Sequence, residues 1–378
     1  AADRGVKPTT ADRIAPLFTA ATLLVAALTF AGWTIADDVS RAIPITVAVL
    51  VVACPCALAL SHPLSAAAGL GAAARRGLLF RSSDALLDMS TVDTVMLDKT
   101  GTITAGEMQV TDAADDVLRI AAALERNSIH PIARAIVREC AERGIALPFA
   151  SDVRETPGVG IEGVVGGHAW SLRSGGPGIV NLLYPDGRVA GQIRLADGLR
   201  ADAPATVHAL HARGVNVVLL TGDHEVAARR MAAAAAIDVV LADCDPEKKA
   251  EYIRDARGRG RTVLYAGDGL NDGPALAAAD VGIAMAGGAA SSVLVADGVI
   301  SSSAIAPILA GFRAADACRQ VIRANVRRSV IYNISAVAAA AAGLVNPLVA
   351  AVLMPISSGL VIRGAFRVER LMRAAEEA

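Results

Sequence analysis

The sequence lacks several features that would assign it to common classes of protein. Its formal net charge of −1 leaves no excess of basic residues, which argues against a protein that binds nucleic acid. Its five cysteines show no spacing typical of a disulfide framework, and their scatter suits a reducing compartment. Aromatic residues are scarce, and the first apolar run is too long for the core of a cleavable signal peptide.

Apolar residues, in contrast, are abundant and concentrated in stretches without charge. The mean hydropathy of +0.47 makes membrane spans the first interpretation to test. No Asp, Glu, Lys or Arg occurs in 14–36, 42–74 or 329–362. We expect one span in the first stretch, one span followed by a helix of small residues in the second, and two short spans in the third. The alternative is that these stretches are buried helices of a soluble core.

Arginines flank these stretches on one side. They are Arg75, Arg76, Arg323, Arg327, Arg328, Arg363 and Arg367. If four helices cross in order, these arginines all face the cytoplasm under the positive-inside rule. We therefore expect a multi-pass protein of a bacterial-type inner or plasma membrane, with the polar segment between the second and third spans in the cytoplasm.

That polar segment, roughly 80–320, alternates short apolar runs with helical patterns. The runs at 92–97, 215–220 and 262–266 each end in a polar loop and precede a helical stretch. This pattern is typical of a parallel sheet with helices on both faces. The insertion at about 107–192 is rich in glycine and turn residues after Pro148, and it is expected to form a separate small domain.

An aspartate follows the first of these runs, in the sequence Asp98-Lys99-Thr100-Gly101-Thr102. Open α/β sheets bind ligands at the carboxyl ends of their strands. An aspartate there can attack phosphorus and form an acyl phosphate, while the small residues behind it let backbone N–H groups approach phosphate oxygens. The alternative is an ordinary aspartate in a turn, which the specificity of this pentapeptide disfavours.

Polar loops also follow the second and third runs. Phosphoryl transfer requires neutralisation of charge more than covalent help. The loop residues expected to complete the hydrogen bonding around the phosphate are Thr221, Gly222, Asp223, Asn271 and Asp272. We expect Asp98, Thr100 and Asp268 to hold Mg²⁺, a hard cation that prefers oxygen ligands. Lys249, rather than Lys248, is expected to supply a positive charge to the phosphate.

The three loops in this order resemble the phosphorylation site of the P-type ATPases, and the resemblance covers nearly the whole chain. It implies a haloacid-dehalogenase-like parallel sheet with an inserted α+β nucleotide-binding domain, joined to about four transmembrane helices. It also implies ATP, Mg²⁺ and an aspartyl-phosphate on Asp98. We expect residues 1–12 to be the remnant of a linker and residues 13–74 to form two transmembrane spans. The phosphorylation domain is expected in two parts, 75–106 and 193–320, with the nucleotide-binding domain inserted between them at 107–192. Residues 321–367 are expected to form two further spans, and residues 368–378 a cytoplasmic tail.

The segment 125–131 resembles the Ser-Glu-His-Pro element of the heavy-metal subclass, and 158–163 resembles its glycine turn. The residues implied to contact the nucleotide are Glu125, His130, Pro131, Gly158 and Gly160. One departure is Ile129, which stands where the subclass has a glutamate before His130. We expect this change to weaken the affinity for ATP.

Cys54-Pro55-Cys56 lies within the second apolar stretch and resembles the defining element of heavy-metal pumps. Proline interrupts a helix and exposes backbone carbonyls at membrane depth, and two thiols beside the break are soft ligands. The alternative is a pair of small buried thiols that pack as apolar groups. His62 follows soon after, and it is interpreted as a residue at the membrane exit rather than as a ligand.

The identity of the metal depends on the last two spans. Their candidate ligands are Tyr332, Asn333, Met354 and Ser358. A thioether favours Cu(I), and this pattern resembles the copper-transporting branch. Cu(I) or Ag(I) is therefore expected, with Zn²⁺ or Cd²⁺ as the alternative. A Met packed in the core and an Asn that joins two helices would be the structural explanation of the same residues.

Parts of a whole pump are missing from this sequence. The resemblance implies an actuator domain with Thr-Gly-Glu and often an N-terminal Cys-x-x-Cys domain, and neither motif occurs. We therefore expect a fragment, or a chain whose N-terminal half is a separate polypeptide, with slow dephosphorylation. A metallochaperone and the lipid bilayer are further expected partners.

Two other functions remain open. A soluble phosphatase of the haloacid-dehalogenase group would normally have an acidic residue where Thr100 stands, and a metal-binding remnant without catalysis would not accept phosphate from ATP.

Overall fold

The computed structural model describes the chain in six segments: 10–54, 56–156, 158–176, 178–268, 272–286 and 294–377. The chain divides into two compact units. The first unit comprises Ala1–Met96, His208–Val218 and Cys244–Ala378. The second unit comprises Leu97–Val207 and Leu219–Asp243.

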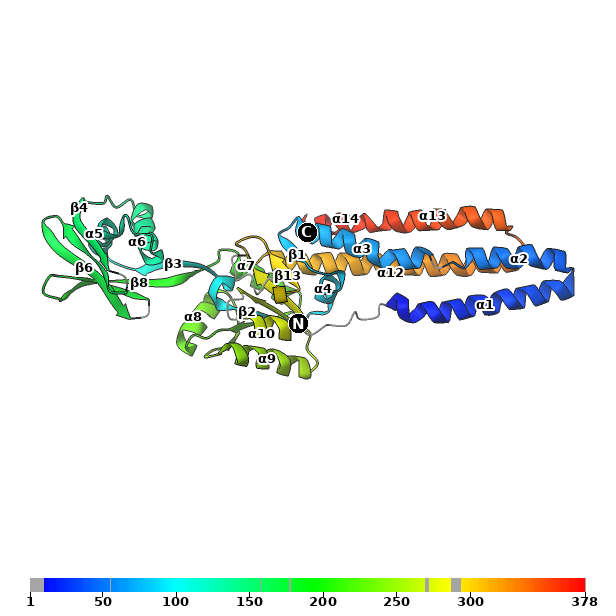
Figure 1. Ribbon diagram of the computed structural model, residues 1–378, viewed down its shortest axis with the longest axis horizontal. Helices are drawn as coiled ribbons and strands as arrows, with labels where there is room; N and C mark the ends of the chain where they lie inside the picture. The colour runs from blue at the N-terminus through cyan, green and yellow to red at the C-terminus, as the bar shows by residue number, and fades with distance from the viewer. Residues whose placement is uncertain are drawn as a thin grey trace. The chain divides into compact units, whose positions relative to one another are not determined.

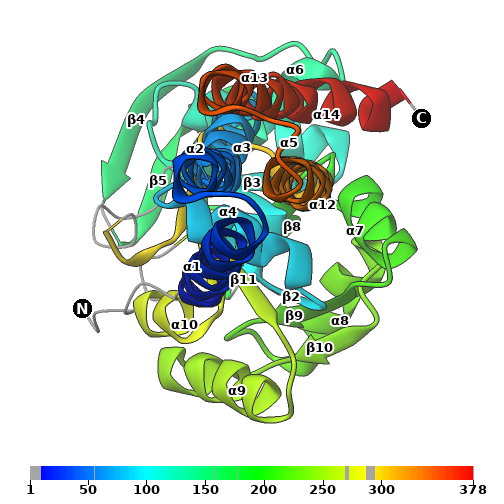
Figure 2. The ribbon, with the colours of Figure 1, turned by 90° about the vertical axis from the view of Figure 1, so that its right-hand side faces the viewer.

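Long apolar helices dominate the first unit. They are α1 (Thr10–Ala36), α2 (Val39–Val52), α3 (Cys56–Ala74), α12 (Pro307–Ala341) and α13 (Pro347–Ala365), followed by the polar helix α14 (Arg367–Glu377). Helices α12 and α13 each pack against both α2 and α3, and α1 packs against α2. Figure 1 shows α2 and α3 following one another along nearly the same line, and Figure 2 shows α2, α12 and α13 gathered when viewed end-on.

Two helical regions of the described chain are long and apolar enough to cross a membrane. They are Thr19–Ala36 and Pro347–Glu377, and the apolar helix Val39–Val52 is shorter. Only 11% of the first window and 22% of the second are buried. A core helix of a soluble protein would be mostly buried, so this exposure favours the membrane interpretation over the soluble one. The expectation of four spans stays a prediction.

The turn between α12 and α13 lies where the sequence predicts a division. Asn346 caps α13, because its Oδ1 accepts a hydrogen bond of 2.8 Å from the Val349 N–H. Gly343 has φ +77, a left-handed conformation that glycine adopts without strain. Helix α12 begins well before the expected span, at Pro307, so its first half extends beyond the charge-free stretch.

A seven-stranded sheet carries the polar loops. Its strand order is β1-β13-β12-β11-β2-β9-β10. The strands are β1 (Leu78–Phe80), β2 (Thr94–Asp98), β9 (Asn216–Leu220), β10 (Val239–Leu241), β11 (Val263–Gly267), β12 (Val281–Met285) and β13 (Gly298–Ile300). The pairs β11–β12 and β12–β13 are parallel, and β1 pairs antiparallel with β13 at the edge. The three predicted runs are therefore strands β2, β9 and β11, and every residue of β2 and β11 is buried.

Shorter helices accompany these strands. They are α4 (Ser83–Asp88), α7 (Ala203–Ala212), α8 (Glu225–Ala234), α9 (Pro246–Gly258) and α10 (Gly273–Ala278). The alternation of strand and helix confirms the predicted α/β class.

The insertion in the second unit is an antiparallel sheet covered by two helices. Its strand order is β3-β8-β7-β6-β5-β4. The strands are β3 (Thr104–Asp112), β4 (Ala150–Thr156), β5 (Gly160–Val165), β6 (His168–Gly176), β7 (Ile179–Leu183) and β8 (Val189–Leu199). Helices α5 (Asp115–Glu125) and α6 (Pro131–Glu142) lie on one face, as Figure 1 shows. Their apolar sides form a core with the sheet, centred on residues such as Leu118, Ile136 and Leu172.

Candidate phosphorylation and metal sites

Asp98 ends strand β2 in a buried position. Only 5% of the residue is exposed, and an irregular turn, Lys99–Ile103, follows directly. Gly101 has φ +67 within this turn, so a side chain here would strain the backbone. Strand β2 thus ends in a buried carboxylate, and the chain turns directly after it.

Two side chains of the second unit brace this turn. The Gly101 N–H donates to Thr104 Oγ1 at 3.1 Å, and the same hydroxyl donates to the Lys99 carbonyl at 2.9 Å. Arg200, only 7% exposed, donates from Nε to the Thr102 carbonyl at 2.6 Å and from Nη2 to the Gly101 carbonyl at 2.8 Å. Burial lowers the pKa of Arg200. Sequence reasoning missed Arg200, and its only signal is its position directly after strand β8.

The second predicted loop meets the first through an ion pair. Lys99 Nζ lies 2.6 Å from Asp223 Oδ2. The Asp223 N–H donates to Thr221 Oγ1 at 3.1 Å, and Thr221 itself is buried. The structure therefore brings predicted residues of both loops together within the second unit. The exposed residues of the two loops are Thr100 and Gly222.

The third predicted loop belongs to the first unit and contains a buried ion pair. Lys249 Nζ lies 2.8 Å from Asp272 Oδ1, and the side chains are 9% and 2% exposed. Lys248 is exposed, so burial separates the two lysines that the sequence left as candidates. Asp268 is half-buried just after β11. Asn271 lies outside the described residues.

A pocket of about 410 Å³ opens in the insertion. The predicted nucleotide residues that line it are Glu125, His130, Gly158 and Gly160. Pro131 does not line it and is the first residue of α6. The structure adds Glu155, Arg173 and Gly178 to the lining. Sequence reasoning missed these three because they lie far apart in the sequence, on β4, on β6 and in the turn before β7, and belong to no recognisable motif.

The side chain of His130 has a defined role at the start of α6. Its Nδ1 accepts a hydrogen bond of 3.2 Å from the Ile132 N–H, so the proton of a neutral ring is assigned to Nε2. Nε2–H could then donate to a bound base. Ile129, which replaces the expected glutamate, is 83% exposed and does not line the pocket.

Glu125 is buried in the wall of this pocket. Desolvation raises its pKa to about 7, the negative charge of Glu155 adds to the rise, and a hydrogen bond with Ser128 opposes it. The pocket thus contains a carboxyl group that is poised between its neutral and charged forms near neutral pH.

Two glycines let the backbone of the pocket approach closely. A Cβ on Gly160 would lie 2.0 Å from the carbonyl oxygen of Leu172, and its φ is +143. A Cβ on Gly178 would lie 2.6 Å from the carbonyl oxygen of Leu195. No other residue type fits at either position without a shift of the strands. Gly158, by contrast, has open space around its Cβ position, although its φ is +75.

The predicted ion ligands lie on helices that pack together. Cys54 is half-buried at the break between α2 and α3. Pro55 and the side chain of Cys56 lie outside the described residues. Tyr332 is half-buried in α12, and Met354 and Ser358 are half-buried in α13.

One face of α12 is polar and buried. Asn325, Ser329 and Asn333 recur at every fourth residue, and none is more than 8% exposed. Residues with this spacing lie on the same side of a helix. Helix α12 packs against α2 and α3, and the side chains of this polar face are buried.

Comparisons with known proteins agree with these observations. Residues 92–280 match the haloacid dehalogenase-like hydrolase family. The "Copper-exporting P-type ATPase" of Mycobacterium tuberculosis (strain H37Rv) is 36% identical, and the match covers 96% of this chain and 51% of that protein. "Copper-transporting ATPase 1" of Rhizobium meliloti (strain 1021) is 37% identical over 94% of this chain and 48% of its own length. This chain spans about half the length of these curated relatives.

Solved structures give the same result for the fold. The crystal structure of a zinc-transporting PIB-type ATPase in the E2.Pi state is 31% identical, with a TM-score of 0.84. The match covers 97% of this chain and 65% of the zinc-transporting protein.

Proposed function

The chain belongs to the haloacid-dehalogenase-like hydrolases and is a homologue of heavy-metal P-type ATPases, and we propose that it forms the phosphorylated core of such a pump. The observation that carries this proposal is the buried Asp98 at the end of β2, followed by a braced turn and the Lys99–Asp223 ion pair. A pump of this kind couples ATP hydrolysis to movement of a metal ion through the membrane.

Asp98 is proposed as the nucleophile. One carboxylate oxygen attacks the γ-phosphorus of ATP, the bond from that phosphorus to the β–γ bridging oxygen breaks, and ADP leaves with the electron pair. Water later attacks the phosphorus of the aspartyl-phosphate and returns Asp98 as a carboxylate. An acidic residue in place of Thr100 could accept a proton from the attacking water and speed the second step, so Thr100 favours a longer-lived intermediate.

Oxygen donors near the nucleophile fit a hard cation. We propose that Asp98, Thr100 and Asp268 hold Mg²⁺, because carboxylate and hydroxyl oxygens are the donors that this cation prefers. Bound Mg²⁺ would neutralise the charge on the phosphate oxygens. Lys249 would add a positive charge, while Thr221, Asn271 and Asp272 would supply hydrogen bonds.

ATP is proposed to bind in the pocket of the insertion. The backbone at Gly160 has room to approach a flat base, and Nε2–H of His130 can donate to one of its ring nitrogens. Glu125 lies in the wall of the same pocket, where its carboxyl group can contact the base in either protonation state. Closure of the insertion would then deliver the γ-phosphate to the nucleophile.

Cu(I) is proposed as the transported ion, with Ag(I) as a second soft substrate. Reduced Cys54 and Cys56 supply thiolates, and Met354 supplies a thioether, which Zn²⁺ uses little. Tyr332, Asn333 and Ser358 would complete the site. The curated relatives are named for copper. Zn²⁺ is the second candidate, since a structural homologue is named as a zinc transporter.

We also propose a membrane location with the catalytic parts in the cytoplasm. The exposed apolar surfaces of α1 and α13 would contact lipid. The arginines that follow α3, lie in the middle of α12 and lie in the last turn of α13 fit the positive-inside rule. A metallochaperone that delivers the ion, or a polypeptide that supplies the actuator, would be a further partner.

The proposal is tested by phosphorylation of the full chain in lipid nanodiscs with γ-labelled ATP under reducing conditions. We expect an acid-stable, hydroxylamine-sensitive label that increases with Cu(I) and is absent in Asp98→Asn. Asp186→Asn is the matched control, because Asp186 is an exposed aspartate in the turn before β8.

Each outcome has a distinct meaning. A label that persists in Asp98→Asn would exclude this aspartate as the nucleophile. Labelling that is stimulated by Zn²⁺ but not by Cu(I) would identify zinc, the second candidate, as the transported ion. Metal binding without any label would support a non-catalytic remnant, whereas rapid release of phosphate without a stable label would support a phosphatase.

A further inference from the structure

Seven arginines gather where α12 meets α13 and α14. A pocket of about 660 Å³ lies between α12 and α14, and a neighbouring pocket of about 580 Å³ extends it along the end of α13. The arginines that line these two pockets, here called the arginine pocket, are Arg319, Arg323, Arg327, Arg328, Arg363, Arg367 and Arg370. Asp316 is the one acidic residue in their linings.

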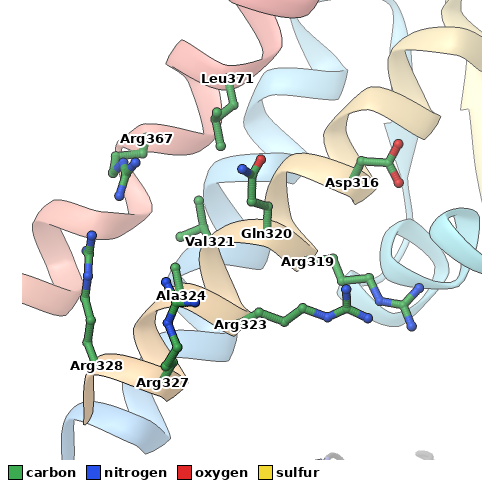
Figure 3. A pocket seen from close by; sticks show the side chains of 10 residues that line it. All are labelled: Asp316, Arg319, Gln320, Val321, Arg323, Ala324, Arg327, Arg328, Arg367 and Leu371. Carbon is green, nitrogen blue, oxygen red and sulfur yellow. The ribbon is translucent and has the colours of Figure 1, made fainter. Parts of the chain in front are cut away.

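Almost none of this charge is neutralised within the described chain. Asp316 forms its ion pair with Arg213, at 2.6 Å, and Arg319 donates a hydrogen bond to Ser90. Among the residues that the structure describes, the other six arginines of the pocket form no ion pair. Figure 3 shows Arg328 of α12 and Arg367 of α14 reaching toward each other across the pocket. The two positive charges repel each other, and an anion bound between them would be attracted by both.

The pocket lies at the end of an exposed apolar surface. On α12, Arg327 and Arg328 are followed within one turn by Ile331, which is 60% exposed. On α13, Leu360 is 61% exposed one turn before the first arginine of that helix, and Phe366 is 72% exposed beside Arg367. A ligand that bound the arginines would therefore have apolar surface directly beside its charged group.

We propose that the arginine pocket binds the phosphate headgroup of an anionic phospholipid, whose acyl chains lie along the exposed faces of α12 and α13. Guanidinium groups pair with phosphate oxygens through two parallel hydrogen bonds. Anionic lipids are enriched in the cytoplasmic leaflet, where the proposed orientation places this pocket. The inference depends on the membrane location given above but not on ATP hydrolysis or on the transported ion.

Binding is measured by fluorescence anisotropy with the full chain in non-ionic detergent, without ATP or metal. The probes are labelled phosphatidylglycerol, labelled phosphatidylcholine and, as a soluble competitor, glycerol 3-phosphate. The test variant carries Arg323→Gln, Arg327→Gln and Arg367→Gln. Each arginine near an anionic lipid surface contributes about 1 kcal/mol, so we expect affinity for phosphatidylglycerol to fall on the order of 100-fold.

A matched control changes the net charge equally at another place. It carries Arg230→Gln, Arg254→Gln and Arg261→Gln, three exposed arginines outside the pocket. We expect it to retain affinity within about twofold. A variant with lysine at the three pocket positions should retain most of the binding, which separates loss of charge from loss of folding.

Several results would overturn the proposal. Equal losses in the pocket variant and the matched control would show that binding is non-specific attraction to net charge. Equal affinity for phosphatidylcholine would exclude recognition of anionic headgroups. Displacement of the lipid by millimolar glycerol 3-phosphate would identify a soluble phosphate ligand instead. Phosphorylation from ATP is measured in a separate experiment. Its absence would refute the proposed pump function but would not affect the measurement of lipid binding.

Discussion

Glu125 should make the stability of the inserted domain depend on pH. Its pKa is raised from the ordinary value of 4.5 to about 7, mainly because the pocket wall removes it from water. Between these two values the folded insertion keeps a proton that the unfolded chain releases. Stability contributed by the protonated form is therefore complete below pH 4.5 and is lost as the pH rises through 7.

The magnitude follows from the size of this shift. A rise of that size corresponds to a free-energy difference of roughly 3 kcal/mol between the protonated and ionised forms, since each unit of pKa shift is worth about 1.4 kcal/mol. Water at the mouth of the pocket screens part of this free-energy difference. We therefore expect the insertion to lose about 2 kcal/mol of stability between pH 5 and pH 8. Glu125→Gln cannot ionise and should lose little over the same range.

Hydrogen exchange of the α5 backbone amides provides the assay, with rates corrected for the intrinsic effect of pH. The free energy of opening should fall by about 2 kcal/mol in the native chain and stay nearly constant in Glu125→Gln. Glu142→Gln is the control, because Glu142 is an exposed glutamate at the end of α6. The reasoning is refuted if the native chain and Glu125→Gln show the same dependence on pH.

Three further predictions concern Gly160, Lys249 and Met354. Gly160→Ala places a Cβ 2.0 Å from the Leu172 carbonyl oxygen, so equilibrium ATP binding should weaken roughly tenfold or more, and unchanged affinity would exclude a close backbone approach. Lys249→Ala leaves the buried Asp272 carboxylate unpaired, which should destabilise the chain by about 3–5 kcal/mol in thermal unfolding. Adding Asp272→Asn should recover part of that loss, and no recovery would argue against a coupled pair. Met354→Leu removes a thioether at similar volume, so stimulation of phosphorylation should weaken for Cu(I) but not for Zn²⁺; an equal effect on both would remove Met354 from the ion site.

The sequence predicted the α/β class because each central strand is a short apolar run that ends in a polar loop. The predicted run 92–97 and strand β2 differ by one or two residues at each end, and every residue of β2 is buried. Periodicity located the strands well for this reason. It was less informative for α12, which begins before the predicted span, because its first half mixes apolar and charged residues.

The residues that line the pocket of the insertion were predictable only in part. Glu125 and His130 belong to a recognisable segment, and the structure places both in the pocket wall. Glu155 comes from β4 and Gly178 from the turn before β7, and only the pairing of the sheet brings them to the same pocket. The raised pKa of Glu125 also depends on this assembly, because burial is a property of the folded insertion.

The sequence by itself determined the chemistry of this protein: an aspartate and two polar loops after apolar strands, two thiols beside a proline, and charge-free stretches bounded by arginine. These signals are local, since each depends on neighbouring residues and on the period of one helix or strand. The tertiary structure alone decided which groups share an environment. It buried Arg200 against the turn after β2, paired Lys249 with Asp272, and brought arginines from three helices together at the arginine pocket. The physical reason is that desolvation and ion pairing depend on distances between residues far apart in the sequence, and these exist only once the chain has folded.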